Sequence, residues 1–304
     1  MTLLGTIAAI NRYPVKSMMG EELNAALVTT AGLAGDRAYA LADGDNHIGT
    51  AKIQRKWAPL FRARYIVEPN GNGLVPAEMT LPDGSRVMTD EPGINDRLSE
   101  LLGFSARLIT EKPPDLKLES PPLGQVPESD DSPTIDFPVP NGFFDLGSLH
   151  LLTTATLDTL RSLNPAVRFE PRRFRPNFVV QTTAEASGFF ENDWPCKTIA
   201  IGDEVLIRVM MPTIRCVVTT VAQDDLPSEP DVLRTAAKHN SANVGVYAMV
   251  EQGGMVRRGD EVRVAYGPDF VKDEIRQQVR SELREEVVGD VMQKAKKEQW
   301  GMPN

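Results

Sequence analysis

The sequence predicts a mainly β chain of the α+β class, in which two β-rich halves are joined by a proline-rich connection and followed by a C-terminal helix. Short runs of β-branched and aromatic residues alternate with glycine turns over residues 2–110 and again over residues 145–266. Gly202-Asp203 and Gly259-Asp260 each introduce a strand, as is typical of a closed antiparallel sheet. Residues 268–304 instead carry apolar side chains at every fourth position, which indicates a helix.

The composition excludes several classes of protein. The chain has 304 residues, and its 33 lysines and arginines against 42 aspartates and glutamates give a net charge of −9. This charge argues against broad binding of nucleic acid or anionic lipid, because both need a large basic surface. No apolar run approaches the roughly 18 to 20 residues of a membrane-spanning helix, and the N-terminus lacks the charged segment of a signal peptide. We therefore expect a cytoplasmic protein without a membrane span, which binds any anion locally.

Residues 1–111 are expected to form a first, β-rich domain. Leu81-Pro82-Asp83-Gly84 predicts a hairpin turn, because an Asp-Gly pair favours tight reversal of the chain. A short helix is expected from Ile94 to Leu102, where Gly103 stops it. The strand-like runs of this domain lie at residues 3–10, 23–29, 37–41 and 63–67.

The connection between the two halves is predicted at residues 112–140. Eight of the 23 prolines of the chain lie there, together with the acidic run ESDDSP. Proline removes a backbone donor and breaks helices, so we expect a long extended segment without a regular helix or a central strand. This segment separates the first domain from a second one, at residues 141–267.

The second domain is expected to combine strands with two helices. Thr153 or Thr154 can cap a helix that runs to about Leu163, and a second helix is expected from Asp231 to His239. The predicted strands lie at residues 178–181, 198–201, 204–210, 217–221, 244–251 and 260–265.

The C-terminal extension, residues 268–304, predicts a charged amphipathic helix. An apolar series at every fourth position advances by roughly 40° per step, so the apolar stripe winds around the helix. We expect this helix to pack on its own barrel or on a sister subunit, which would make a homodimer. A membrane-surface helix or a docking arm is the alternative interpretation.

Basic residues gather in the turns of this acidic chain. Guanidinium groups on a stiff turn suit fork-like binding of phosphate or carboxylate, although a solvated charged loop explains the same composition. Four arginines and an asparagine lie within ten residues, namely Arg168, Arg172, Arg173, Arg175 and Asn177. Lys16 and Ser17 follow Tyr13-Pro14, and Arg37 follows Gly35-Asp36, so other turns also present donors at strand ends.

Two cysteines are too few for a zinc knuckle or an iron–sulfur cluster, but they leave room for one reactive or metal-binding thiolate. Cys216 follows Arg215, and an adjacent guanidinium stabilises a thiolate; an inert buried cysteine is the alternative. We interpret Cys196 as structural.

Either His150 or His239 can serve as the base of a nucleophilic thiol, although neither lies in a known nucleophile motif. The chain has no glycine-rich phosphate loop of the Walker or Rossmann type.

Several short motifs follow one another in a specific order. They are Tyr13-Pro14-Val15-Lys16-Ser17, Gly32-Leu33-Ala34-Gly35-Asp36-Arg37, Asp145-Leu146-Gly147, His150-Leu151-Leu152-Thr153-Thr154-Ala155, Phe174-Arg175-Pro176-Asn177, Ile201-Gly202-Asp203, Arg215-Cys216 and Gly259-Asp260. The ordered set covers residues 1–267 and resembles the MOSC family with its N-terminal β-barrel domain. The resemblance implies an N-terminal β-barrel-like domain packed on a MOSC β-barrel.

The same resemblance implies a molybdenum cofactor carried by molybdopterin. Cys216 would be the metal ligand, because a soft thiolate completes the sulfur coordination that the pterin dithiolene begins. Arg215 would act beside it, by tuning the thiolate or polarising the substrate. Pyridoxal phosphate is not expected. The implied cofactor-binding residues are Lys16, Ser17, Arg37, Thr153, Thr154, Arg173, Arg175 and Asn177.

The resemblance further implies an oxidoreductase that reduces N–OH to N–H in small N-hydroxylated substrates, with loss of water. Residues 268–304 contain no cysteine and cannot ligate an iron–sulfur cluster, so electrons are expected from a separate redox protein. The alternative is a carrier of the cofactor or of sulfur, in which Cys216 works without redox turnover. A third interpretation is a barrel that binds another phosphate ligand.

Overall fold

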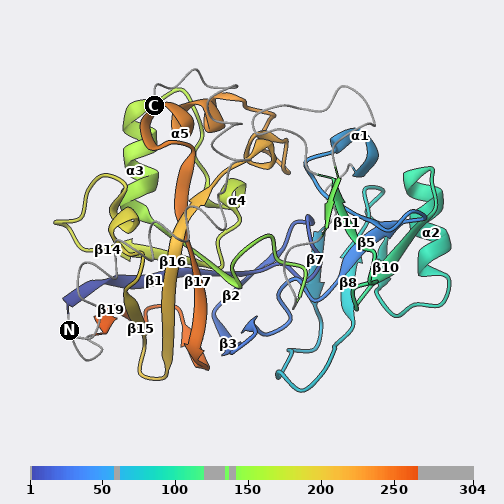
Figure 1. Cartoon of the computed structure of the whole chain (residues 1–304), viewed down its shortest axis with the longest axis horizontal. Coiled ribbons are helices and arrows are strands. Elements are labelled where there is room, and N and C mark those ends of the chain that lie inside the picture. Colours follow the sequence, from blue (N-terminus) through green and yellow to red (C-terminus); the bar gives the residue numbers. More distant parts are fainter. Residues whose placement is uncertain (1, 58–61, 120–133, 137–141, 266–304) are drawn as a thin grey trace.

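The computed structural model describes residues 2–57, 62–119, 134–136 and 142–265. Its strands form a barrel and a smaller α+β unit, which lie beside each other in Figure 1. The predicted mainly β fold of the α+β class is confirmed. The predicted C-terminal helix at residues 268–304, with the homodimer contact expected from it, lies outside the described residues.

Seven strands close the barrel in the order β14-β13-β17-β16-β15-β19-β1, and β1 pairs back with β14. All of these pairs are antiparallel except β13 with β14. Strand β1 comes from the start of the chain, so pairing crosses the predicted division between residues 1–111 and 141–267. The barrel strands are β1 (Thr2–Arg12), β13 (Leu149–Thr153), β14 (Phe178–Thr182), β15 (Thr198–Ile201), β16 (Val205–Ile214), β17 (Asn243–Gln252) and β19 (Glu261–Ala265).

The barrel core is built from the alternate side chains that each strand turns inward. Ile7 and Ile10 of β1 meet Val180 of β14 and Val246 of β17 in one buried cluster, which also contains Trp194. Strand β2 (Glu21–Leu23) extends the sheet from β1. A further three-stranded sheet of β3 (Ala25–Thr29), β4 (Gly32–Leu33) and β18 (Gly254–Arg257) adds apolar side chains to the same core.

The helices of the barrel unit are α3 (Thr154–Leu163), α4 (Pro171–Phe174) and α5 (Asp231–Asn240). Helices α3 and α5 share a buried apolar cluster at one end of the barrel (Figure 1). Thr153 caps α3 as predicted, because its hydroxyl accepts a hydrogen bond from the Thr156 amide at 3.2 Å. Among the described residues, no helix is both long and apolar enough to cross a lipid bilayer.

The predicted strand at residues 217–221 is wrong, because Val217–Thr220 forms the 3-10 helix η2. The threonines of this segment bind local carbonyls: Thr219 donates to the Cys216 carbonyl at 3.0 Å, and Thr220 donates to the Val217 carbonyl at 2.8 Å. Such local bonds compete with strand pairing, although the side chains are β-branched. A second 3-10 helix, η1, covers Phe190–Asp193.

The smaller unit consists of two sheets and two helices. One sheet has the order β10-β5-β6-β11-β12, and the other has the order β7-β8-β9. The predicted hairpin at Leu81–Gly84 joins β8 to β9, and the predicted helix at Ile94–Leu102 is confirmed as α2, which ends at Gly103. The elements are β5 (Ala40–Asp43), β6 (His47–Ile48), α1 (Gln54–Trp57), β7 (Arg62–Tyr65), β8 (Ala77–Thr80), β9 (Arg86–Met88), β10 (Ala106–Ile109), β11 (Lys117–Glu119) and β12 (Thr134–Asp136).

The expectation that residues 112–140 hold no central strand is wrong. Strand β11 lies between β6 and β12, parallel to the first and antiparallel to the second. It occupies a run free of proline at residues 115–119, so its backbone donors are available for pairing. Leu116 and Leu118 hold this strand against the sheet, because both side chains are buried against Phe143 and β5.

A prediction of stability follows from the closure of the barrel by β1. Replacing the fully buried Ile10 by alanine leaves a cavity in the core, so we expect Ile10→Ala to lower the free energy of unfolding by about 2–5 kcal/mol. Leu3→Ala on the same strand is the matched control, because Leu3 is 43% exposed, and we expect it to change stability by less than about 1 kcal/mol. Urea unfolding followed by circular dichroism measures both values; equal losses in the two variants would contradict the closed barrel.

Candidate functional site

A rigid turn before β14 presents the first site residues. Helix α4 covers Pro171–Phe174 and is capped by Arg175, whose φ of 54° lies in the left-handed region. Pro176 then fixes the backbone, and Asn177 is buried with both ends of its amide bound. Its Nδ2 donates to the Asp36 carboxylate at 2.9 Å and to the Asn11 carbonyl at 3.2 Å, while its Oδ1 accepts from the His150 amide at 3.0 Å. This fixed turn holds the Arg175 side chain in one direction.

Two guanidinium groups stack on the ring of Tyr13. The Cζ of Arg175 lies 4.2 Å from the ring centroid, and that of Arg37 lies 4.5 Å from it. Arg37 pairs with Asp36, whereas Arg175 donates to the Met18 carbonyl at 2.6 Å. Burial and the neighbouring charge of Arg37 lower the pKa of Arg175 to about 10. Two close cations, of which only Arg37 forms an ion pair with a carboxylate among the described residues, favour the binding of an anion.

Lys16 lies in the turn after Tyr13, and its side chain binds residues 143 and 145 at the start of the second half of the chain. Its buried Nζ donates to the Asp145 carboxylate at 2.5 Å and to the Phe143 carbonyl at 3.3 Å. Ser17 follows with a φ of 64°, so the turn is tight. Burial would raise the pKa of Asp145, but the charges of Lys16 and Lys52 hold it below its ordinary value. Asp145 is therefore an anion in the folded protein, although half of its side chain remains exposed.

Arg215 and Cys216 lie directly after β16, at the start of η2. The Arg215 amide donates to the Ala242 carbonyl at 2.8 Å, and its Nη2 donates to the Phe174 carbonyl at 2.8 Å. The Nε of Arg215 is buried and has no hydrogen-bond partner among the described residues. The Cys216 side chain is partly exposed and belongs to no disulfide. Within the described residues, an unpaired donor and a free thiol therefore occupy consecutive positions.

Lys52 is a site residue that the sequence reasoning missed. It follows a turn between β6 and α1, and it interacts electrostatically with Cys216 and Asp145. Burial would lower the pKa of Lys52, but these two acidic groups raise it above its ordinary value. No hydrogen bond or ion pair of its Nζ involves another described residue. A single lysine after a turn has no signature in sequence, so only the fold reveals its position.

A polar network fixes the segment that carries Lys52. At one end, the Asp43 carboxylate accepts from the His47 amide at 2.8 Å and from the Lys56 ammonium at 2.6 Å. At the other end, Glu119 accepts from the Trp57 indole at 3.2 Å and from Lys56 at 3.3 Å. Both carboxylates are buried. The loop from β6 to α1 is therefore held on both sides of Lys52.

The structure separates Arg173 from the other predicted cofactor-binding residues. Arg173 is fully buried, and its guanidinium donates only to the carbonyls of Arg168, Thr219, Val221 and Pro227. The donors of Arg173 hold η2 and the loop after it, which is a structural role, and the expected part of Arg173 in cofactor binding stays a prediction. The neighbouring Arg168 and Arg172 face outward and pair with Asp225.

The two threonines predicted to bind the cofactor use their hydroxyls within the protein. Thr153 donates to the buried Glu191 carboxylate at 2.5 Å, in addition to capping α3. The Thr154 hydroxyl accepts from the Thr182 amide at 3.1 Å and pairs with the Thr182 hydroxyl. The structure therefore gives both side chains a role in joining α3, η1 and β14.

His150 lies beside the site but is not a charged group. Its Nε2 faces the Val244 carbonyl at 3.2 Å, so this nitrogen is the donor in the neutral ring. Burial lowers the pKa of His150 well below its ordinary value, and nearby Arg215 lowers it further. His239, the other histidine considered as a base, is exposed on α5. Within the described ranges, no three histidine, cysteine or acidic side chains cluster closely enough to hold a metal ion.

Comparison with solved structures gives remote likenesses. The YUAD protein from Bacillus subtilis is 13% identical, with a TM-score of 0.43 over 88% of this chain and 98% of that chain. YiiM from Geobacillus stearothermophilus is 15% identical, with a TM-score of 0.31 over 47% of this chain and 67% of that chain. No curated protein matches the sequence.

Comparison with protein families is more specific. The model of the MOSC N-terminal beta barrel domain matches residues 4–88, which include Lys16, Arg37 and Lys52. The model of the MOSC domain matches residues 143–263, which include Arg175 and Cys216. The two matches cover more than half of the chain and contain both sides of the site, so the chain belongs to the MOSC family with its N-terminal β-barrel domain.

Proposed function

We propose that this protein binds a molybdenum cofactor through Cys216 and uses it to reduce N-hydroxylated compounds. MOSC domains are linked to molybdenum-cofactor binding and to sulfurase-like proteins. The observation that carries the proposal is the position of the Cys216 thiol. Cys216 is partly buried and interacts electrostatically with Lys52, and its neighbour Arg215 interacts with Tyr13, the ring on which Arg37 and Arg175 lie.

The donor set of the site fits such a cofactor. A thiolate is a soft ligand of the kind that sulfur-rich metal centres use, so Cys216 would hold the molybdenum. Arg37 and Arg175 would hold the phosphate, because guanidinium groups bind phosphate oxygens in pairs. The buried Nε of Arg215 is a donor without an acceptor in the part of the chain that the structure describes. Lys16, Ser17 and Asn177 would shape the turns around the phosphate and pterin.

The chemistry divides between the cofactor and the chain. When bound, the cofactor supplies the two-electron exchange by which an N–OH group, two electrons and two protons become N–H and water. Lys52 interacts electrostatically with Cys216, so its ammonium would lie beside the reacting centre. Lys16 and Asp145 form an ion pair near Lys52, with which Asp145 also interacts electrostatically. His150 adds no positive charge at neutral pH, and a separate redox protein would supply the electrons.

Removal of the thiol tests the metal ligand. We expect Cys216→Ala, purified from a host with molybdenum and cofactor synthesis, to lose most of its molybdenum, because the soft ligand is gone. Cys196→Ala is the matched control and should keep the wild-type content. Elemental analysis of the three proteins measures the ratio of molybdenum to chain. Wild-type protein without molybdenum, or Cys216→Ala with a full complement, would contradict the assignment.

Removal of one guanidinium tests the phosphate site. We expect Arg175→Ala to bind the cofactor about ten- to hundredfold more weakly, because a charge-assisted contact contributes about 1.5–3 kcal/mol. Arg172→Ala lies three residues away but removes only surface ion pairs with Asp224 and Asp225, so its occupancy should stay at the wild-type level. Fluorescence of the pterin released from purified protein measures occupancy. Similar occupancy in both variants would be inconsistent with phosphate binding by Arg175.

Turnover separates a reductase from a carrier. We expect the cofactor-loaded protein to reduce an amidoxime to its amidine with a chemical electron donor, and Cys216→Ala to lose this activity. Chromatography of the product measures the rate. A loaded protein that holds molybdenum through Cys216 but reduces no N-hydroxylated compound would instead support the carrier.

A further inference from the structure

Tyr247 differs from the other tyrosines of the described residues in having a hydroxyl without a partner. Tyr13 donates to the Pro176 carbonyl at 3.4 Å, Tyr39 to the Val75 carbonyl at 2.9 Å, and Tyr65 to the Gly35 carbonyl at 2.9 Å. In the part of the chain that the structure describes, no group forms a hydrogen bond with the Tyr247 hydroxyl. Tyr247 is partly buried and its hydroxyl is not fully enclosed, so this hydroxyl is open to a ligand.

The ring of Tyr247 is held in place by its neighbours. Strand β17 places Tyr247 opposite His150 of β13, and the centroids of the two rings are 5.8 Å apart. Gly147 lies against the same side chain, since a Cβ at Gly147 would be only 2.8 Å from the Tyr247 Cβ and 3.1 Å from its Cγ. The ring of Tyr247 can therefore occupy this position only because Gly147 has no side chain. Because the ring is already fixed in the free protein, a ligand that binds its hydroxyl does not have to immobilise the side chain.

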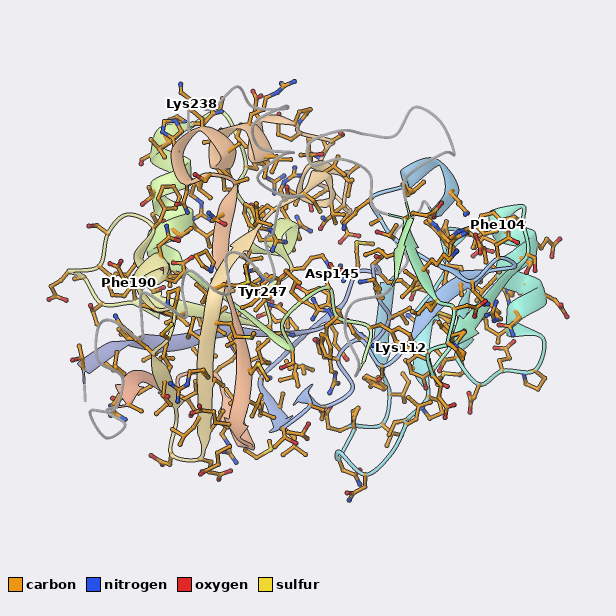
Figure 2. The ribbon with its side chains drawn as sticks, in the orientation of Figure 1. Phe104, Lys112, Asp145, Phe190, Lys238 and Tyr247 are labelled. Atoms are coloured by element: carbon orange, nitrogen blue, oxygen red, sulfur yellow. The ribbon has the colours of Figure 1, made fainter. Side chains whose placement is uncertain are left out.

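The ring belongs to the same site as the proposed metal ligand. Tyr247 interacts electrostatically with Cys216, Asp145, Arg215 and Arg37, and Figure 2 shows Tyr247 on the barrel close to Asp145. Burial raises the pKa of Tyr247 to about 12, so the hydroxyl keeps its proton at neutral pH. Asp145 is already bound to Lys16. Tyr247 therefore offers the site a neutral donor, in contrast to the cations around it.

We propose that Tyr247 donates a hydrogen bond to the oxygen of a bound N–OH group and thereby positions the substrate beside Cys216. The inference rests on the reductase function proposed above. Reduction removes that oxygen as water, so the N–H product no longer has the acceptor. Tyr247 would thus strengthen the binding of substrate relative to product, which makes it a specificity-determining residue and favours product release.

The test compares binding of one compound before and after reduction. Cofactor-loaded wild type and Tyr247→Phe are titrated by calorimetry with an aryl amidoxime and with the corresponding amidine, without any electron donor. We expect Tyr247→Phe to weaken amidoxime binding by about five- to tenfold, as for loss of one hydrogen bond, and to change amidine binding by less than about twofold. Tyr39→Phe is the matched control, because it also removes a phenol hydroxyl, and both dissociation constants should match wild type.

Each outcome bears on a different claim. Equal weakening of both ligands, or no weakening of the amidoxime, would overturn the role of Tyr247 while the reductase function stands. Loss of molybdenum from Tyr247→Phe would also overturn it, because the hydroxyl would then act on the cofactor. Wild-type protein that holds no molybdenum or reduces no amidoxime would refute the proposed function itself.

Discussion

The geometry of the site depends on the buried contact between Asp36 and Asn177. The Asp36 carboxylate accepts from the Tyr13 amide at 2.7 Å and from Asn177 at 2.9 Å, and it pairs with Arg37. Asn177 in turn binds the end of β1 and the start of β13. A buried polar network in which every group has a partner permits one arrangement, because each alternative leaves a donor unpaired. This contact therefore holds the two arginine-bearing turns beside the ring of Tyr13.

That arrangement would let a chain of net charge −9 bind the proposed anionic cofactor. The charges of Arg37 and Arg175 lie over one ring and repel each other, and the lowered pKa of Arg175 reflects this repulsion together with burial. A bound anion would relieve the repulsion, so its binding would also stabilise the folded state. Lys52 and Lys16 add positive charge on the side of Cys216. Asp145 is the counter-charge of both lysines.

Local signals predicted much of this structure, and tertiary contacts decided the rest. Gly103 and Thr153 mark helix ends through their own backbone or side chain, so both were predicted correctly. The arginine cluster predicted local binding of an anion, but it did not indicate which guanidinium would take part. The Arg173 side chain points into the protein because it binds carbonyls more than 40 residues away in the sequence. Lys52 and Tyr247 reach the site through a loop and a strand with no local signature. Strand β11 was missed because the prolines on both sides dominate the composition of its segment.

The claim on which the function rests is that the Cys216 thiolate binds molybdenum. X-ray absorption at the molybdenum edge counts sulfur neighbours directly, and it can be applied to wild type and to Cys216→Ser loaded in the same host. Because serine offers oxygen in place of sulfur, the wild-type spectrum should contain one sulfur neighbour more than the variant. The same number of sulfur neighbours in both proteins would contradict a bond between Cys216 and the metal.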